Sequence, residues 1–524
     1  MTTSESERVF VLGIDGVPWD LLSKWSRRDE LSNFKQIFEE GASGPLESTV
    51  PPNTALAWPS ITTGVRPDKH GIYSFRKVQS NHSNKMSMST DKRHSDLWDM
   101  LSPSVVGNVP MTYPAREIDG KVVTGMMTPS RDAGFTHPES LSKEIEEVTP
   151  NYEIGLDWNK YSEDEETFLE ELSQLLEARR ELMRHLMKTQ EWELFFFVYT
   201  GLDRLQHLIW DEEVLLEYYK EIDEILGEVM EYTEENASNL FVVSDHGFGP
   251  ISKFVNLNSI LAENGFLQQS DDRQRNLLSQ IGVTKANLTS ILESVNLYQP
   301  LVRNLPKPVL NNITTRVPGN HELFDVNFTN TIAFAYGYGN IYINYEGRFE
   351  EGAVREDERA EIKERLYKIF DNYQDPEAGN QPIDVYDGEK VFPTDLSSPD
   401  LVVVGKDGYE VKTSISSSAI RPATKKAASH ESTGILLAKG PSIGKVDVSG
   451  ASVLDIVPTI LHSLGRPIPT STDGDVLDIF EIGSPPAENG IERTQYTRET
   501  TSTTETDQDF KDVKERLEGL GYIE

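Results

Sequence analysis

Three apolar runs of this chain each lead directly into an aspartate, and this pattern limits the folds that the chain can adopt. The runs are "RVFVLGIDG" (8–16), "WELFFFVYTGLD" (192–203) and "NLFVVSDHGFG" (239–249). Short, continuously apolar segments of this kind are typical of strands buried on both faces of a parallel sheet. We therefore expect three buried parallel strands, each with a carboxylate at or just beyond its end.

The segments around these strands indicate the rest of the architecture. Two more strands are predicted at 400–405 and 433–441, and helical apolar spacing covers 165–188 and 212–232. Strands that alternate with helices favour an α/β fold with a doubly wound, mostly parallel sheet flanked by helices. In such sheets ligands bind at the carboxyl ends of the strands, where the three aspartates fall.

The domain organisation is expected to be one catalytic domain followed by a tail. The domain spans 1–480 and carries two insertions, at about 76–160 and 264–330, which are predicted to be cap segments over a substrate pocket. Residues 481–508 are rich in Ser, Thr, Pro and charge, which predicts a linker, and 509–524 are predicted to form a short helix.

Charge and composition restrict the partners and the compartment. Acidic residues outnumber basic ones by 86 to 50, which gives the 524 residues a formal charge of −36. Such a field repels nucleic acid polymers and anionic membranes, so neither is expected as a partner. Because the carboxylates are dispersed, we interpret them as the surface of a halophilic protein whose self-repulsion is screened by molar salt. The absence of cysteine, of a signal sequence and of an apolar run near the roughly 20 residues that span a membrane predicts a soluble, cytoplasmic protein.

Two short motifs place histidines beside the strand-end aspartates. In "DRLQHLIW", Asp203 and His207 are four residues apart, so on a helix they share one face and can share an ion, although a surface pair or cap has the same spacing. In "SDHGFG", Asp245 and His246 leave a buried strand before Gly247, although an Asx turn would look alike.

Two further positions complete a set of metal-ligand types. Asp15 follows an apolar strand and could instead be a helix N-cap, and His430 in "ASHESTG" could instead be a solvated loop residue. Taken together, the strand-end positions form two His/carboxylate sets without sulfur, which suit borderline divalent ions such as Zn²⁺ or Mn²⁺.

The segment "VPPNTALAWPSITTGVRPDKHGIYSF" (50–75) indicates where a nucleophile could lie. Its prolines and glycines predict a sharp bend that places Thr54 at the start of a short helix. We interpret Thr54 as a nucleophile whose hydroxyl is deprotonated by a bound metal, with the helix N-terminus favouring an anionic substrate. The alternative is a threonine that only caps the helix.

Taken as an ordered set, these motifs resemble the alkaline phosphatase superfamily in its type I phosphodiesterase/nucleotide pyrophosphatase branch. The resemblance is to phosphohydrolase/phosphomutase proteins of archaea and bacteria, and it runs from residue 9 to 524 outside the insertions. The matching motifs are "VLGIDG", "PPNTALAWPSITTGVRPDKHGI", "GLDRLQHLIW", "VVSDHGFG", "SHESTGILLAKGP", "VLDIVPTILHSLGRPIPTSTDG" and "RLEGLGYIE".

The resemblance implies an alkaline phosphatase-like fold and a two-metal site. One ion would be held by Asp15, Thr54, Asp245 and His246, and the other by Asp203, His207 and His430. The implied reaction is in-line displacement at a phosphate ester of a small molecule, with Thr54 forming a phosphothreonine that is then hydrolysed. The nine-residue step from Thr54 to Thr63 supports Thr54 over Thr49, Thr62 or Thr63 as the nucleophile.

Some positions depart from the family pattern and leave alternatives open. Nucleotide pyrophosphatases place an Asn about 21 residues after the nucleophile to bind a phosphoryl oxygen, and Phe75 stands there. Arg93 and Arg348 are candidates for the arginine that monoester-specific relatives carry. His70 is a motif residue of the family but is not a metal ligand there. Monoester and diester substrates therefore both remain open, as do a phosphomutase or phosphotransferase activity and a non-catalytic accessory protein on the same fold.

Overall fold

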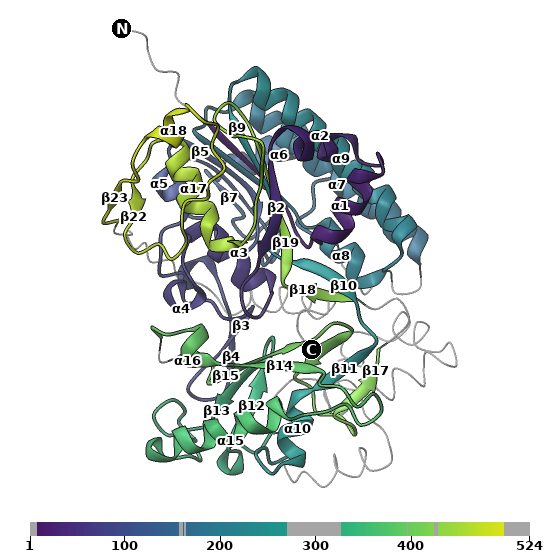
Figure 1. The fold of residues 1–524 in the computed structure, drawn as a ribbon, viewed down its shortest axis with the longest axis vertical. Helices are drawn as coiled ribbons and strands as arrows, with labels where there is room; N and C mark the ends of the chain where they lie inside the picture. Colours follow the sequence, from purple (N-terminus) through teal and green to yellow (C-terminus); the bar gives the residue numbers. More distant parts are fainter. Residues whose placement is uncertain are drawn as a thin grey trace.

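The computed structural model describes residues 8–156, 161, 164–269, 326–395, 397–423 and 428–496. Within these ranges no helix is both long enough and apolar enough to cross a membrane. Figure 1 shows a larger body built around a sheet and a smaller body below it. We call the larger one the main body, and the described residues between 253 and 422 the cap.

A ten-stranded sheet lies at the centre of the main body. Its middle strand is β1 (Val9–Ile14), with β8 (Leu194–Tyr199) and β9 (Asn239–Val243) parallel to it on either side. The strands beyond β8 are β5 (Ser104–Val109), β6 (Gly120–Thr124) and β7 (Thr136–His137), and those beyond β9 are β19 (Thr433–Lys439), β2 (Ala42–Glu47), β20 (Val446–Asp447) and β21 (Ala451–Ser452). β19 is antiparallel to both of its neighbours and β7 is antiparallel to β6, while the other pairings are parallel. The predicted mostly parallel α/β fold is confirmed.

Helices cover both faces of this sheet (Figure 1). One face packs against α1 (Trp19–Arg27), α2 (Ser32–Glu40), α6 (Leu141–Val148), α7 (Glu165–Thr189), α8 (Gly201–Leu208) and α9 (Glu212–Glu235). The other face packs against α3 (Thr54–Thr63), α5 (Leu97–Met100) and α17 (Ile456–Ser463).

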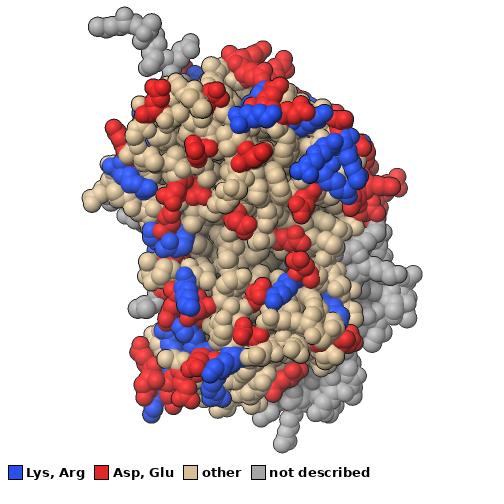
Figure 2. Space-filling view, in the orientation of Figure 1, with Lys and Arg blue, Asp and Glu red and all other residues tan. Residues whose placement is uncertain are grey.

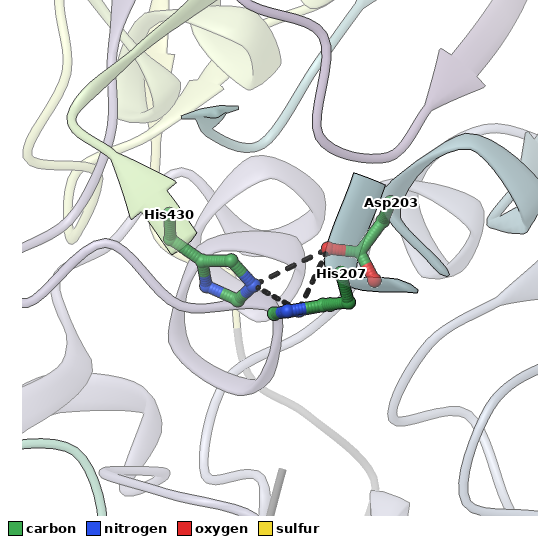
Figure 3. Close-up of side chains that lie close together, drawn as sticks. All are labelled: Asp203, His207 and His430. Atoms are coloured by element: carbon green, nitrogen blue, oxygen red, sulfur yellow. Dashed lines mark hydrogen bonds and ion pairs between the residues drawn. The ribbon is translucent and has the colours of Figure 1, made fainter. Parts of the chain in front are cut away.

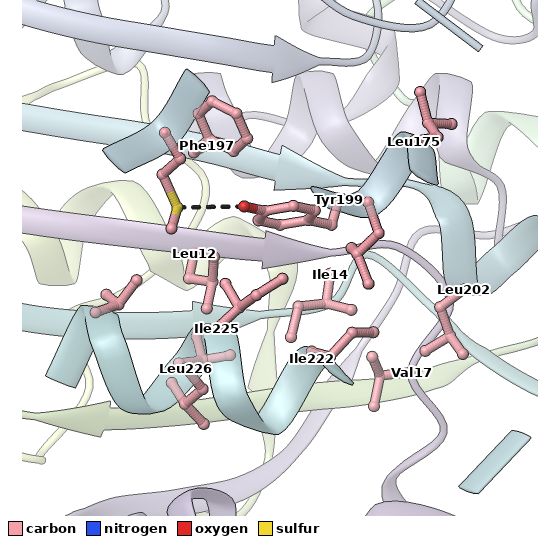
Figure 4. Packing of buried hydrophobic residues seen from close by; sticks show 14 of the residues in the cluster. Leu12, Ile14, Val17, Leu175, Phe197, Tyr199, Leu202, Ile222, Ile225 and Leu226 are labelled. Atoms are coloured by element: carbon pink, nitrogen blue, oxygen red, sulfur yellow. Dashed lines mark hydrogen bonds between the residues drawn. The ribbon is translucent and has the colours of Figure 1, made fainter. Parts of the chain in front are cut away.

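The alternation of side chains along β1 explains why both faces are apolar. Leu12 and Ile14 lie in the core on one side of the sheet, and Val11 lies in the core on the other. Figure 4 shows Leu12 and Ile14 beside Ile222 and Ile225 of α9. A strand covered on both sides needs a continuously apolar sequence, as "VFVLGI" is.

The cap has its own apolar core, which includes Phe334, Ile341, Leu366 and Phe370. Its strands are β11 (Lys253–Asn256), β12 (Ala333–Tyr336), β13 (Asn340–Ile343), β14 (Ile383–Asp387), β15 (Leu401–Gly405), β16 (Tyr409–Lys412) and β17 (Ile420–Pro422). Its helices are α10 (Leu257–Glu263), α15 (Arg359–Asp371), α16 (Gly388–Val391), and the 3₁₀ turns η3 (Phe328–Asn330) and η4 (Glu356–Glu358).

The remaining elements join the two bodies or close the main body. β10 (Gly247–Pro250) leads toward the cap and pairs with β18 (Ala428–Glu431), which leads back. The others are α4 (Pro67–His70), β3 (Arg76–Val78), β4 (Asn84–Met86), η1 (Ser89–Asp91), η5 (Val453–Asp455), β22 (Ile468–Pro469), α18 (Pro485–Glu488) and β23 (Arg493–Thr494). The cap also contacts the main body directly, because Arg93 Nη1 donates to Asp395 Oδ2 at 2.7 Å and the Thr394 N–H donates to Asp68 Oδ2 at 3.0 Å.

The structure corrects part of the expected organisation. The stretch 76–160 is not an insertion as a whole, because it supplies β5, β6 and β7 to the central sheet. Most of the second expected insertion, 270–325, and the predicted helix 509–524 lie outside the described residues. Of the predicted linker, residues up to 496 are described, and Arg493 and Thr494 pair with β22.

A buried charge network holds the far end of α3. Asp96 accepts hydrogen bonds from Thr62 Oγ1 at 2.8 Å and from Arg116 Nη2 at 3.0 Å, and it also pairs with Lys92. Burial acts to raise the pKa of Asp96, but Lys92 and Arg116 outweigh it and hold the pKa below its ordinary value. The carboxylate is therefore charged in the folded protein.

We expect Asp96→Asn to lower the free energy of unfolding by about 3 kcal/mol at neutral pH, because it removes the negative charge between two buried cations. Since the folded pKa lies below the unfolded one, the difference from wild type should persist down to about pH 4 and shrink below it. Urea unfolding across this pH range measures it, with the exposed Asp132→Asn as the control. Equal stability of the two variants would contradict the prediction.

Candidate active site

The site lies at the edge of the sheet where β1, β8 and β9 end. Asp15 follows β1 directly, Asp203 lies in the first turn of α8 just after β8, and Asp245 is two residues beyond β9. All three side chains are buried. Because these strands are parallel, their carboxyl ends meet at one edge and bring the aspartates together.

The first group of side chains consists of Asp15, Asp245 and His246, with Thr54 beside them. One ligand-type atom from each of the first three lies within 4.8 Å of the others. The His246 Nε2 atom is 3.6 Å from Asp15 Oδ1, 3.3 Å from Asp245 Oδ2 and 3.2 Å from Thr54 Oγ1. All four side chains are buried, so a small set of polar atoms surrounds this imidazole nitrogen away from water.

The second group consists of Asp203, His207 and His430, which point toward one another in Figure 3. Asp203 Oδ1 is 3.2 Å from His430 Nε2 and 3.6 Å from His207 Nε2, and the two Nε2 atoms are 3.0 Å apart. The four-residue step in α8 brings Asp203 and His207 to one side of the helix. His430 comes from β18 instead, which is paired to β10.

The two groups are in contact with each other. The rings of His246 and His430 are stacked with centroids 3.8 Å apart and planes 21° from parallel. The pairing of β10 with β18 sets this arrangement, because it places His430 opposite Phe248, two residues after His246. All seven side chains predicted from the sequence therefore lie in one place and in the expected two sets.

Thr54 owes its position to the helix that it begins. α3 starts at Thr54, Asn53 is the N-cap and its Oδ1 accepts from the Ala55 N–H at 3.0 Å, and the helix ends at Gly64 in the left-handed region with φ 69°. The whole helix is buried. As a result, the Thr54 hydroxyl emerges at the positive end of the helix dipole.

Hydrogen bonds outside the two groups orient their members. Trp58 Nε1 donates to Asp15 Oδ2 at 3.0 Å, and the Gly16 N–H donates to Asp245 Oδ1 at 3.3 Å. His246 Nδ1 lies 3.0 Å from the carbonyl of Gly247. An imidazole that donates from Nδ1 keeps an unprotonated Nε2, so His246 presents a lone pair to the group.

His430 is oriented in the same way. Its Nδ1 lies 3.3 Å from the carbonyl of Pro52, two residues before Thr54. Its Nε2 faces Asp203 and His207. The Pro52 contact also ties the start of α3 to β18.

The pKa values show the strain of packing these charges together. Burial, and then the charges of Asp245 and Asp203, raises the pKa of Asp15 well above its ordinary value. Burial and Asp203 raise the pKa of Asp245 to about 7. Burial opposes ionisation of Asp203 as well, but the neighbouring imidazoles of His207 and His430 outweigh it, so its pKa lies below the ordinary value.

Burial disfavours the charged form of two of the imidazoles. Burial lowers the pKa of His207 to about 4, with Asp203 opposing the shift. Burial, followed by the nearby His430, lowers the pKa of His246 well below its ordinary value. Neutral imidazoles beside carboxylates are the protonation state in which both can bind a cation.

The donor atoms fit a divalent cation. Asp15 Oδ1 and Asp245 Oδ2 are buried and accept no hydrogen bond from any residue that the structure describes, although the second oxygen of each carboxylate does accept one. Buried carboxylate oxygens without partners are costly, and a cation is the group that satisfies them. Oxygen and imidazole nitrogen without thiolate form a donor set that suits Zn²⁺ or Mn²⁺.

The other threonines of the motif are engaged elsewhere. Thr49 Oγ1 donates to the Pro51 carbonyl at 2.8 Å, Thr62 Oγ1 to Asp96 at 2.8 Å and Thr63 Oγ1 to the Pro59 carbonyl at 2.6 Å. His70, also outside both groups, lies 3.1 Å from Ser60 Oγ through its Nε2. Of these residues only Thr54 contacts a member of either group.

The two candidate arginines do not lie among the seven side chains. Arg93 pairs with Asp395, and Arg348 Nη1 donates to Asp400 Oδ2 at 2.6 Å inside the cap. Phe75 is buried in an apolar cluster that includes Leu56. The sequence reasoning missed two residues next to the site, Asn53 and Tyr338.

Neither missed residue had a distinctive signal in the sequence. Tyr338, in the cap, lies parallel to the His430 ring, with centroids 5.7 Å apart and planes 8° from parallel. Asn53 precedes Thr54 and has the residue type of any helix cap. The Nδ2 atom of Asn53 is buried without a hydrogen-bond partner, which is a property of the fold and not of the sequence.

Comparison with known proteins identifies the family. A family profile described as type I phosphodiesterase / nucleotide pyrophosphatase matches residues 9–435. The chain belongs to this family. It is accordingly a phosphoric ester hydrolase of the alkaline phosphatase superfamily. A search of curated protein sequences gave no match.

Solved structures of similar fold include members of two enzyme types. Human ectonucleotide pyrophosphatase/phosphodiesterase 5 aligns with a TM-score of 0.50 at 13% identity, over 90% of this chain and 97% of that one. The murine protein was solved in an inactive form, with one threonine replaced by alanine, in complex with AMP. It aligns with a TM-score of 0.50 at 12% identity, over 91% of this chain and 100% of that one. Phosphonoacetate hydrolase from Sinorhizobium meliloti, in complex with phosphonoformate, aligns with a TM-score of 0.54 at 14% identity, over 86% of this chain and 94% of that one. At these identities the likeness shows a shared fold.

Proposed function

We propose that this family member hydrolyses phosphate mono- or diesters of small molecules through a phosphothreonine on Thr54, with two divalent cations, Zn²⁺ or Mn²⁺, as cofactors. The observation that carries the proposal is the placement of the Thr54 hydroxyl. It stands at the N-terminus of a buried helix, 3.2 Å from His246 Nε2, and that nitrogen also faces carboxylate oxygens that accept no hydrogen bond.

The two groups divide the ligands between the cations. Asp15, Asp245 and His246, together with Thr54, would hold one, and the second group of Asp203, His207 and His430 would hold the other. A bound divalent cation lowers the pKa of a hydroxyl group that it contacts and neutralises negative charge on a phosphate.

The chain's own residues account for the bond changes. Thr54 Oγ1 forms a bond to phosphorus while the bond from phosphorus to the leaving oxygen breaks, and that oxygen receives the hydroxyl proton of Thr54. A water molecule then bonds to phosphorus as the bond to Thr54 Oγ1 breaks, and the second water proton returns to Thr54. His246, whose Nε2 is 3.2 Å from Thr54 Oγ1, would hold the cation beside this hydroxyl, and the N-terminus of α3 favours the phosphate anion.

The relatives support the same class of ligand. The murine relative binds AMP, and the Sinorhizobium enzyme has been captured with phosphonoacetate as well as phosphonoformate. These are small anions with a phosphate or phosphonate group. The formal charge of −36 also favours a small phosphorylated substrate over a nucleic acid polymer.

Thr54 variants test the nucleophile. Thr54→Ala should lose about 10³-fold or more of the turnover of a chromogenic phosphodiester or monoester, because water must replace a positioned hydroxyl. Thr54→Ser should keep part of it, and acid-quenched wild type should carry a phosphoryl group on the peptide that contains residue 54. Thr49→Ala, which removes a buried hydroxyl bonded to the Pro51 carbonyl, is the control. Wild-type turnover by Thr54→Ala, or label on another threonine, would refute the covalent step.

Elemental analysis tests the cofactors. Protein purified without chelator should contain about two equivalents of Zn²⁺ or Mn²⁺. His207→Ala and His430→Ala should each lower the content by about one equivalent, and the double variant by no more, because they hold the same ion. Asp15→Ala should affect the other ion. His185→Ala, which removes a histidine paired with Glu144 outside both groups, should change nothing. Full activity with no bound metal would end the two-metal proposal.

We further infer that the protein works in a cytoplasm with molar salt, as in haloarchaea. Figure 2 shows acidic side chains spread over the face in view, with fewer basic ones between them. Charges of one sign repel one another at low ionic strength, and the screening length falls from about 8 Å at 0.15 M to about 3 Å at 1 M salt. The midpoint of thermal unfolding should therefore rise as KCl is increased toward about 2 M. A midpoint that is unchanged or falls would contradict a halophilic surface.

A further inference from the structure

Asn53 holds a polar group that nothing else in the described structure uses. The side chain is fully buried, at 0% exposure. Its Oδ1 accepts from the Ala55 N–H at 3.0 Å, which fixes the orientation of the amide, whereas its Nδ2 has no hydrogen-bond partner. A buried N–H₂ group without an acceptor is destabilising, so its retention points to a role outside the folded chain itself.

The position of this donor suggests what it binds. Asn53 directly precedes Thr54, whose Oγ1 is 3.2 Å from His246 Nε2. As the N-cap, it lies at the positive end of the α3 dipole, where the Leu56 and Ala57 N–H groups donate to its carbonyl and the Ala55 N–H donates to its Oδ1. An amide donor and a helix N-terminus next to each other favour an oxyanion in the same place.

Four other side chains of the motif region and the cap are engaged elsewhere. Phe75 is buried in an apolar cluster and carries no donor. Arg93 pairs with Asp395, Arg348 donates to Asp400, and Lys92 pairs with Asp96. Asn53 is thus the side-chain donor that the structure places next to the nucleophile.

We propose that Asn53 Nδ2 donates a hydrogen bond to a non-bridging oxygen of the phosphoryl group while Thr54 forms its bond to phosphorus. The inference rests on the proposed role of Thr54 and assigns a second catalytic contact beside it. The donor is fixed before the substrate arrives, because the bond from Ala55 to Oδ1 holds the amide plane. A preorganised donor of this kind acts most strongly on the charge that develops in the transition state.

Substitution of Asn53 tests the contact while the cap is kept. Asn53→Ser retains a capping oxygen for the Ala55 N–H and loses the amide donor, and Asn53→Asp retains the shape and the capping oxygen but replaces the N–H₂ group with an acceptor oxygen. We expect both to lower kcat for a chromogenic phosphate ester about 10²- to 10³-fold with little change in KM. Orthovanadate, which mimics the five-coordinate phosphorus, should inhibit the variants more weakly than wild type by a similar factor.

Asn108→Asp is the matched control. Asn108 is also buried, its Oδ1 accepts from Tyr152, and its Nδ2 likewise has no partner among the described residues, but it lies in β5 and is not next to Thr54. Its positive φ of 57° is one that Asp tolerates. This variant should keep the wild-type kcat and the wild-type inhibition by vanadate.

The outcomes separate this contact from the function on which it rests. Wild-type kcat and vanadate inhibition in both Asn53 variants, with Thr54→Ala inactive, would overturn the Asn53 contact and leave the nucleophile in place. An equal loss in Asn108→Asp, or a loss that follows unfolding or reduced metal content, would make Asn53 a structural residue and overturn the contact too. Wild-type turnover by Thr54→Ala would instead remove the proposed function, and the Asn53 contact with it.

Discussion

The repulsion among three buried carboxylates is the constraint around which the site is arranged. Asp15, Asp203 and Asp245 come from the ends of three neighbouring strands, so the parallel sheet itself forces them together. Water cannot screen the charges there, and the pKa values of Asp15 and Asp245 rise as a result. Donors such as Trp58 Nε1 satisfy one oxygen of a carboxylate, and the imidazoles of His246 and His430 stack where the two groups meet. The repulsion among these carboxylates therefore destabilises the folded protein, and a bound cation would offset it.

The strands β1, β8, β9 and β19 could be predicted from the sequence, whereas the place of β5 and β6 in the same sheet could not. β1, β8 and β9 are continuously apolar because both of their faces are covered. The strands β5 ("SVVGNV") and β6 ("GKVVT") are short and contain glycine, and their pairing with β8 and with each other makes them strands. Tertiary contacts of this kind leave no periodic pattern in the local sequence.

The same distinction applies to the candidate site. The four-residue step from Asp203 to His207 predicts a shared helix face, but no local rule brings in His430, which is 223 residues from His207. Only the resemblance to a family assigned His430 to that group before the structure placed it there. Asn53 was missed because whether a buried amide has an acceptor depends on the packing of the whole chain. The ligand and nucleophile roles of these residues remain predictions.

The connection to the cap has a consequence for how the protein is made. β10 leads out of the main body and β18 returns to it. His246 directly precedes β10, and His430 lies on β18. A chain emerging from the ribosome therefore releases six of the seven side chains before the cap is synthesised and the seventh only after it. Since domains form as units during synthesis, the cap can pack before β18 finds β10. The second group of side chains is completed only by the return of the chain, so a nascent polypeptide that has made the main-body strands β1, β8 and β9 still lacks His430.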